Sequence, residues 1–220
     1  MPSPTFFALP PEKRARIVDE AIAVFSESSF HQASLSELVR RLGISKGSIY
    51  QYFEDKLDLY RWLLIDEVPR QKKHFMETSA GSSPRDFWKQ LEQHIELGMA
   101  FLVAHPRLAR LTAFSADPTA DAAIRGLHTA VCEQGFDELK ELLKAGIASG
   151  DLPPKTNLAM ATSVASAVIG PGLTDIILRE LDAEMHEVLA NTSLRDRLDR
   201  RMRRRLAKQS VAFLKDGLGR

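Results

Sequence analysis

The stretch from Ser34 to Phe53, SLSELVRRLGISKGSIYQYF, constrains the fold more than any other part of this 220-residue chain. Ser34 followed three residues later by Glu37 is a capping box, which predicts a helix beginning at Leu35. Apolar residues then recur at helical spacing. Gly43 directly follows the last of them and predicts the helix end, because glycine adopts the left-handed conformation at little cost.

A second short helix is predicted almost at once, because Ser45 is an N-cap residue. Ile49 and Phe53 share one face of this helix and are expected to point inward. The other surface carries polar and tyrosine side chains, which suit phosphate oxygens and base edges, and Gly47 lets a backbone come close. Two short helices joined by a tight glycine-containing turn form a helix-turn-helix. On this pattern alone, an ordinary helical hairpin with a solvated polar face stays equally open.

Charge and cysteine content limit the classes of protein to consider. The chain has 30 Lys plus Arg against 29 Asp plus Glu, a formal net charge of +1, so any affinity for nucleic acid must come from local placement of charge. Up to Tyr60 the basic residues are matched by at least as many acids, which counts against DNA binding. The single cysteine excludes an internal disulfide and fits a reducing cytoplasm, the expected location. The opening residues are not expected to form a signal peptide.

Residues 156–174 form an uncharged stretch nearly long enough to cross a membrane. Alanine, serine and threonine are frequent in it, and Gly170-Pro171-Gly172 interrupts it. We therefore expect no membrane span, but a helix that must be covered on nearly every side in a soluble protein.

The whole sequence favours an all-α fold in two parts, because apolar residues recur at helical spacing and convincing strand-like alternation is absent. Residues 1–68 are predicted to hold a loose arm before Pro10, three helices, and a connecting helix that Pro69 ends. Residues 69–220 are predicted to form a larger helical body.

Cap residues predict where helices of this body begin. Ser83 before Pro84 marks one start, and Asp117–Pro118 marks another. The last helix is expected to begin at Ser193 and to run until Gly217.

The residues GISKGSIYQYFEDKLDLY, from Gly43 to Tyr60, resemble the second half of the DNA-binding domain of TetR-type repressors. Members of that family carry a small-residue turn, Ser-Lys-Gly, a Tyr-x-x-Phe pattern and a following lysine. The resemblance extends over the first helix, with departures at Ser29, Ala33 and Leu57, where the family usually has glycine, threonine and glutamate. It implies a helix-turn-helix DNA-binding domain in residues 1–68, with its motif at residues 34–53.

The resemblance further implies a sequence-specific transcriptional regulator, in the simplest case a repressor that a small molecule releases from a palindromic operator. Most of the polar residues of the motif, together with Lys56, match DNA-contacting positions of the family, and two serines lie at helix starts near phosphates. Which of them read bases and which hold the backbone stays open. The residues expected to contact DNA are Ser34, Ser45, Lys46, Gly47, Ser48, Tyr50, Gln51, Tyr52 and Lys56.

Family members pair through their last two long helices, so the resemblance implies a homodimer through the uncharged helix and the C-terminal one. Two recognition helices about 34–36 Å apart would then read both halves of a palindrome. Packing of both helices within one subunit is the alternative. For the arginine-rich run 195–205, a solvated and partly salt-bridged face is favoured over a second nucleic-acid or membrane surface.

The helical body of this family usually encloses a cavity for a small apolar or amphipathic effector, whose binding shifts the spacing of the two DNA-binding heads. Each candidate for its lining has plain core packing as the competing interpretation. No cofactor and no metal site are expected, because no two histidines stand at i, i+4 with a further ligand nearby. The candidate lining residues are Trp88, Phe101, His105, Phe114, His128 and Met160.

Two other classes of function were weighed against a regulator. An enzyme is disfavoured, because the sequence has no Gly-rich loop after a strand, no GxSxG, no HExxH and no paired Cys motif. A DNA-bound structural or nucleoid protein of the same fold, without an effector, is the closer alternative. Such a protein would occupy many dispersed sites, whereas a regulator would occupy a few palindromes near promoters.

Overall fold

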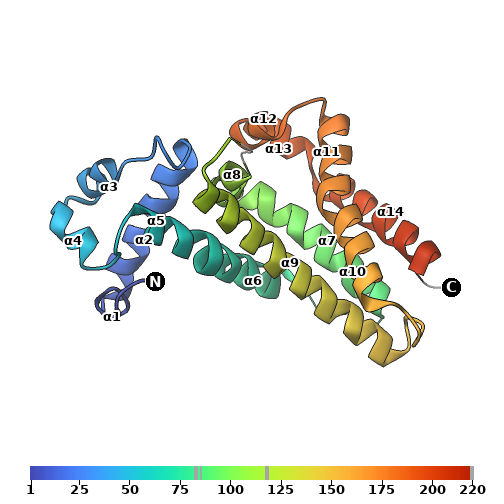
Figure 1. Cartoon of the computed structure of the whole chain (residues 1–220). Helices are drawn as coiled ribbons and strands as arrows, with labels where there is room; N and C mark the ends of the chain where they lie inside the picture. Colours follow the sequence, from blue (N-terminus) through green and yellow to red (C-terminus); the bar gives the residue numbers. More distant parts are fainter. Residues whose placement is uncertain (82–83, 85, 117–118, 219–220) are drawn as a thin grey trace. The chain divides into compact units, whose positions relative to one another are not determined.

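The computed structural model of the protein consists of helices joined by short loops (Figure 1). Every regular element in the residues that the structure describes is helical, which confirms the all-α prediction. These residues are 1–81, 84, 86–116 and 119–218. The helix starts predicted at Ser83 and at Asp117–Pro118 lie outside them.

The chain packs into two compact units, each built from two separate segments. The first unit comprises Met1–Gln71 and Arg107–Val131, and the second comprises Lys72–Pro106 and Cys132–Arg220. Helices α6 and α9 therefore run from one unit into the other. The functional division predicted after residue 68 stays a prediction.

The first unit contains the predicted helix-turn-helix. Its core is formed by apolar residues at helical spacing, among which Ile17, Leu38 and Ile49 are at most 2% exposed. Helix α2 packs on α3, and α3 packs on α4. Its elements are α1 (Pro4–Phe7), α2 (Pro11–Glu27), α3 (Leu35–Leu42), α4 (Lys46–Tyr50), α5 (Lys56–Trp62), η1 (Leu63–Glu67), the start of α6 (Val68–Ser79), α8 (Pro106–Ser115) and the first part of α9 (Ala122–Ser149).

The segment before Pro10 is not the loose arm that the sequence predicted. Its residues form helix α1, and Phe6 on that helix is fully buried, with 0% exposure. The Phe6 ring lies against the rings of Phe53 and Trp62, with centroid separations of 5.0 and 5.2 Å. Burial of this large aromatic side chain offsets the entropy lost in ordering the segment.

Helix α5 continues into α6 through the π-helical turn η1, so Pro69 does not end the connecting helix as predicted. The wider turn just before Pro69 relieves the clash that its ring makes with the preceding turn of an ordinary helix. At the end of this turn the Glu67 carboxylate, 4% exposed, accepts hydrogen bonds from the Arg70 guanidinium at 2.6 and 2.8 Å and from Gln71 Nε2 at 2.7 Å. The buried charge is thus paired and hydrogen-bonded.

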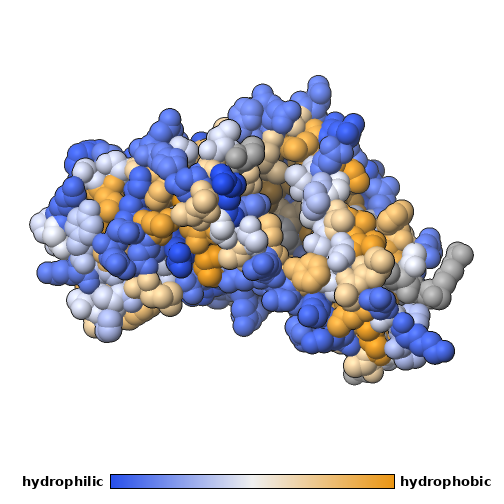
Figure 2. All heavy atoms as spheres, in the orientation of Figure 1, coloured by the Kyte–Doolittle hydropathy of each residue, from blue (hydrophilic) through white to orange (hydrophobic). Residues whose placement is uncertain are grey.

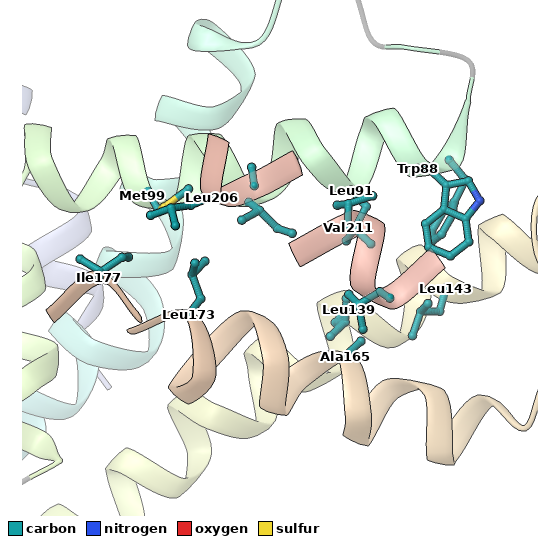
Figure 3. Packing of buried hydrophobic residues seen from close by; sticks show 14 of the residues in the cluster. Trp88, Leu91, Met99, Leu139, Leu143, Ala165, Leu173, Ile177, Leu206 and Val211 are labelled. Atoms are coloured by element: carbon teal, nitrogen blue, oxygen red, sulfur yellow. The ribbon is translucent and has the colours of Figure 1, made fainter. Parts of the chain in front are cut away.

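The second unit is organised around α7, which packs along α14. In Figure 3, side chains from α7, α9, α10, α11 and α14 converge on one core, with Leu91 beside Val211 and Leu139 beside Ala165. Its elements are α7 (Phe87–Ala104), the later part of α9, α10 (Leu158–Ala167), η2 (Val168–Gly172), α11 (Leu173–Leu181), α12 (Met185–Ala190), α13 (Thr192–Arg197) and α14 (Arg200–Leu218).

The last helix differs from the prediction. It does not run uninterrupted from Ser193, but is divided into α13 and α14. The side chain of Asp199 accepts a hydrogen bond from the Met202 amide at 2.7 Å and so caps a new helix. The guanidinium of Arg203 donates to the carbonyl of Leu198 at 2.6 Å, which satisfies an acceptor at the break.

Most of the uncharged stretch lies in a continuous helical rod from Leu158 to Leu181, because Gly170-Pro171-Gly172 is absorbed into the π-helical turn η2. By length and composition alone this rod is apolar enough to cross a membrane. Only 28% of its most apolar window is buried inside the chain, so the chain itself does not supply the expected cover on nearly every side.

Two glycines of α9 provide a matched test of the packing in the second unit. A Cβ at Gly146 would lie 2.7 Å from a ring carbon of Phe87, which is itself buried, whereas a Cβ at Gly135 would meet nothing within 4 Å. We expect Gly146→Ala to lower the free energy of unfolding by about 1–3 kcal/mol. Gly135→Ala is expected to raise it by up to about 1 kcal/mol. Urea denaturation followed by circular dichroism measures both, and equal stability of the two variants would contradict this packing.

Candidate nucleic-acid interface

The turn between α3 and α4 has the predicted geometry. Ser34 Oγ accepts the amide of Ser36 at 3.2 Å and caps α3, and Gly43 ends this helix with φ +67°, in the left-handed region. Ser45 Oγ accepts the amide of Ser48 at 3.2 Å and caps α4. A serine side chain therefore caps the start of each of the two helices.

Helix α4 is five residues long and separates an inner from an outer face. Ile49 and Phe53 are 1% and 3% exposed, which confirms that they point inward. Tyr50 is 47% exposed and lies on the outer face. The other exposed expected contacts are Ser34, Ser45, Lys46, Gly47 and Gln51, and Ser48 is half-buried.

Tyr52 does not share the outward face on which the sequence analysis placed it. Its side chain is 5% exposed, and its ring centroid lies 6.1 Å from that of Phe6 on α1. The contact arises from the ordered segment before Pro10, which sequence periodicity within α4 does not reveal. Tyr52 is thus part of the core of the first unit.

Lys56, which was expected to face a phosphate, is half-buried, and its ammonium bonds to the backbone of its own unit. Its Nζ donates to the carbonyl oxygens of Phe30 at 2.8 Å, Ala33 at 3.1 Å and His31 at 3.4 Å. The ammonium also lies 4.4 Å from the centroid of the Phe30 ring. Burial lowers the pKa of Lys56. These bonds join the start of α5 to the loop before α3.

The basic residues at the end of α3 are engaged by acids. Glu37 does not close the predicted capping box, and its carboxylate instead binds Arg40 at 2.7 and 2.8 Å and Arg41 Nε at 2.7 Å. Arg41 also binds the Glu27 carboxylate at 2.6 and 2.9 Å. Hydrogen bonds from Arg40, and then from Arg41, lower the pKa of Glu37 to about 2. These two arginines therefore add little free positive charge beside α4.

Comparison with known proteins identifies the arrangement. The sequence profile described as "Bacterial regulatory proteins, tetR family" matches residues 17–62, which contain α3, the turn and α4. A solved TetR family transcriptional regulator from Chloroflexus aurantiacus is 29% identical over 99% of this chain and 98% of its own, with a TM-score of 0.66. The chain belongs to the TetR family of transcriptional regulators. It is accordingly a helix-turn-helix DNA-binding regulator, of a family that is not enzymatic.

Two further transcriptional regulators are similar over most of the chain. The transcriptional regulator UidR of Escherichia coli K12 is 24% identical over 174 residues, which cover 78% of this chain and 85% of that protein. The structure of the regulator FadR of Bacillus subtilis in complex with stearoyl-CoA has a TM-score of 0.67 and 18% identity, and covers 93% of this chain and 98% of that one. At this identity the FadR likeness establishes a common fold.

Of the six residues expected to line an effector cavity, four belong to the second unit and two to the first. Phe101 and His105 are neighbours, with ring centroids 4.7 Å apart, and the Phe75 ring lies 5.7 and 5.3 Å from them. Trp88 is 6% exposed in the core of the second unit, whereas Met160 is 62% exposed. The remaining two, Phe114 and His128, belong to the first unit.

A surface hollow at the end of α11 has a different character. Its lining is dominated by carboxylates, and none of the six expected effector residues belongs to it. Within the described residues, no group of three or more His, Cys, Asp or Glu side chains could hold a metal ion. The hollow is lined by Asp175, Leu178, Arg179, Asp182, Ala183, Glu184 and Glu187.

Sequence reasoning missed two groups of residues that shape the interface. The first is the segment of Ser3 and Phe6, which packs against the end of α4. The adjacent aromatic residues Phe6 and Phe7 were a local signal against a loose arm. The second is the pairing of Glu37 with two arginines. This pairing uses the carboxylate that the predicted capping box requires.

Proposed function

We propose that this TetR-family protein is a repressor that binds a palindromic operator as a homodimer and leaves it when a small molecule binds the helical body. The observation that carries the proposal is the exposed polar face of α4. Lys46, Gly47, Tyr50 and Gln51 are all exposed on a helix whose inner face is buried. In Figure 2, hydrophilic and intermediate colours predominate over α3 and α4.

In the proposed complex α4 lies in the major groove. Tyr50 and Gln51 offer hydroxyl and amide groups to base edges, and Lys46 neutralises a phosphate. Ser34 and Ser45 stand at helix starts, where backbone amides and hydroxyls favour phosphate oxygens. Ser48 and Gly47 complete the surface that approaches the duplex.

Tyr52 and Lys56 take supporting roles in this proposal. The Tyr52 ring packs beneath the end of α4, and the Lys56 ammonium holds three carbonyl groups of the loop before α3. Both residues therefore act on the interface through the position of α3 and α4.

The exposed apolar side chains of the second unit support the proposed dimer. Met160 and Val164 on α10, Ile176 on α11 and Phe213 on α14 are 62%, 39%, 45% and 67% exposed. Figure 2 shows hydrophobic residues at the surface in the region of α10. Exposed apolar residues gathered on a few helices favour contact with a second protein surface. Pairing of two copies would cover the apolar surface of the rod from Leu158 to Leu181. In a cytoplasmic regulator the second copy, and not a membrane, is then the proposed cover.

The effector is proposed to be a small molecule with an apolar part. The stearoyl-CoA complex of FadR is one precedent within the same fold for such a ligand. An effector that binds the DNA-free arrangement of the dimer more tightly than the DNA-bound one weakens operator affinity by the same factor as DNA weakens effector affinity.

The first test of this proposal concerns two residues of α4. The wild-type protein selects an operator from a randomised duplex pool, and variants are then titrated against it in mobility-shift experiments. Tyr50→Ala is expected to weaken binding by about 1–3 kcal/mol if Tyr50 contacts a base. Lys46→Gln is expected to reduce the slope of log K against log salt by about 0.9 per subunit, because one phosphate contact is lost.

Lys73→Gln on α6 is the control, since Lys73 is exposed and lies outside the motif. It should leave affinity and slope unchanged. Unchanged affinity in folded Tyr50→Ala removes this residue from the interface, and no selection of any duplex by the wild-type protein contradicts the proposed function.

The second test concerns dimerisation. Sedimentation equilibrium of the wild type is expected to give twice the chain mass of 24.6 kDa. Phe213→Glu places a charge on the proposed contact surface and should give the monomer mass at the same concentration, with unchanged helical circular dichroism. Thr129→Glu, on an exposed position of α9, should remain dimeric. A Phe213→Glu protein with the wild-type mass would remove Phe213 from the proposed dimer contact.

A further inference from the structure

Residues 3–9 form an ordered cap on the first unit. Ser3 Oγ lies at the start of α1 and accepts the amide of Phe6, and the amides of Ala8 and Leu9 bond back to the carbonyls of Pro4 and Phe6 at 3.0 and 3.2 Å. The Arg14 guanidinium donates to the carbonyl of Phe7 at 2.9 Å, which joins this segment to α2.

The cap is bonded directly to the end of α4. Ser3 Oγ donates to the carbonyl of Gln51 at 2.6 Å, and the Ser3 amide donates to the carbonyl of Tyr52 at 2.8 Å. Carbonyl groups at the end of a helix have no partner within the helix. Because α4 has only five residues, these bonds from outside are a large share of what holds its end in place.

The same segment supplies a buried aromatic side chain beneath α4. The Phe6 ring contacts Tyr52 and Phe53 at the end of α4 and Trp62 on α5, with centroid separations of 6.1, 5.0 and 5.2 Å. One side chain thus fixes the spacing between the end of the exposed helix and the connecting helix.

We propose that residues 3–9 are a positioning element for α4, and that Ser3 and Phe6 set operator affinity without touching DNA. This inference rests on the proposed operator binding. Residues 1–9 carry no lysine or arginine side chain, and the Ser3 hydroxyl is engaged by the carbonyl of Gln51, so the segment offers no side-chain cation to a phosphate. Its polar contacts and its buried ring are directed at Gln51, Tyr52 and Phe53, which directly follow the exposed face of α4.

The first measurement uses the free full-length protein and needs no DNA. Amide hydrogen exchange is compared for the wild type, Ser3→Ala and Phe6→Ala. The amides of Gln51, Tyr52 and Phe53 bond to carbonyls within α4, so their exchange reports opening of its end. We expect them to exchange at least about tenfold faster in both variants, with α3 unchanged. Wild-type exchange at these amides in Ser3→Ala would overturn the proposal, even if Phe6→Ala fails to fold.

The second measurement is operator affinity, with controls matched for the loss of side chain. Ser29→Ala removes a half-buried hydroxyl that bonds to Gln32, and Phe25→Ala removes a buried ring that contacts Phe30 and Tyr60. Neither control contact involves α4. We expect Ser3→Ala and Phe6→Ala to weaken binding about tenfold relative to their controls, with Ser3→Thr and Phe6→Leu recovering most of it.

The salt slope separates positioning from direct contact. A positioning element leaves the slope at its wild-type value, whereas loss of a phosphate contact lowers it by about 0.9. Equal affinity losses in variants and controls, or a lowered slope, would overturn the proposal. A wild-type protein that selects no duplex would refute operator binding itself, and hydrogen exchange would still show whether the cap holds α4.

Discussion

Helix α4 is only five residues long, so its position depends on contacts from outside itself. Three kinds of contact hold the helix in position: the buried side chains of Ile49 and Phe53, the left-handed turn at Gly43, and the hydrogen bonds from Ser3 to the two carbonyl groups that follow the helix. The polar face that we propose for DNA is exposed because these contacts use the opposite face and the end of the helix. Rigid support for a small interacting surface is what specific recognition requires.

The placement of charge gives a physical reason for two such helices. The net charge is +1, and near α4 the arginines 40 and 41 are bound by Glu37 and Glu27, while the ammonium of Lys56 is bound by carbonyls. The neighbourhood of α4 in one head therefore offers few free cations to the phosphates that dominate affinity for DNA. A symmetric pair doubles both phosphate and base contacts. The exposed apolar side chains of α10, α11 and α14 lie in the second unit, where such a pair could form without using α4.

Features that depend on residues near one another in the sequence were predicted correctly. The serine caps, the Gly43 turn and the inward direction of Ile49 and Phe53 depend on neighbouring residues, and all were predicted. The cap from Ser3, the burial of Tyr52 and the bonds of Lys56 depend on residues at least 23 positions apart, which periodicity does not detect. Pro69 and Pro171 were predicted to interrupt helices, but π-helical turns accommodate both. Such a turn depends on the surrounding packing as well as on the proline.

In the proposed complex two copies of α4, each fixed on its own unit, enter successive major grooves on one face of a duplex. Hydroxyl-radical footprinting of the wild-type protein on its selected operator tests this most directly. We expect two protected stretches related by a dyad, with centres about one helical turn, 10–10.5 base pairs, or a multiple of it apart. A single asymmetric protected stretch at saturating protein would contradict it.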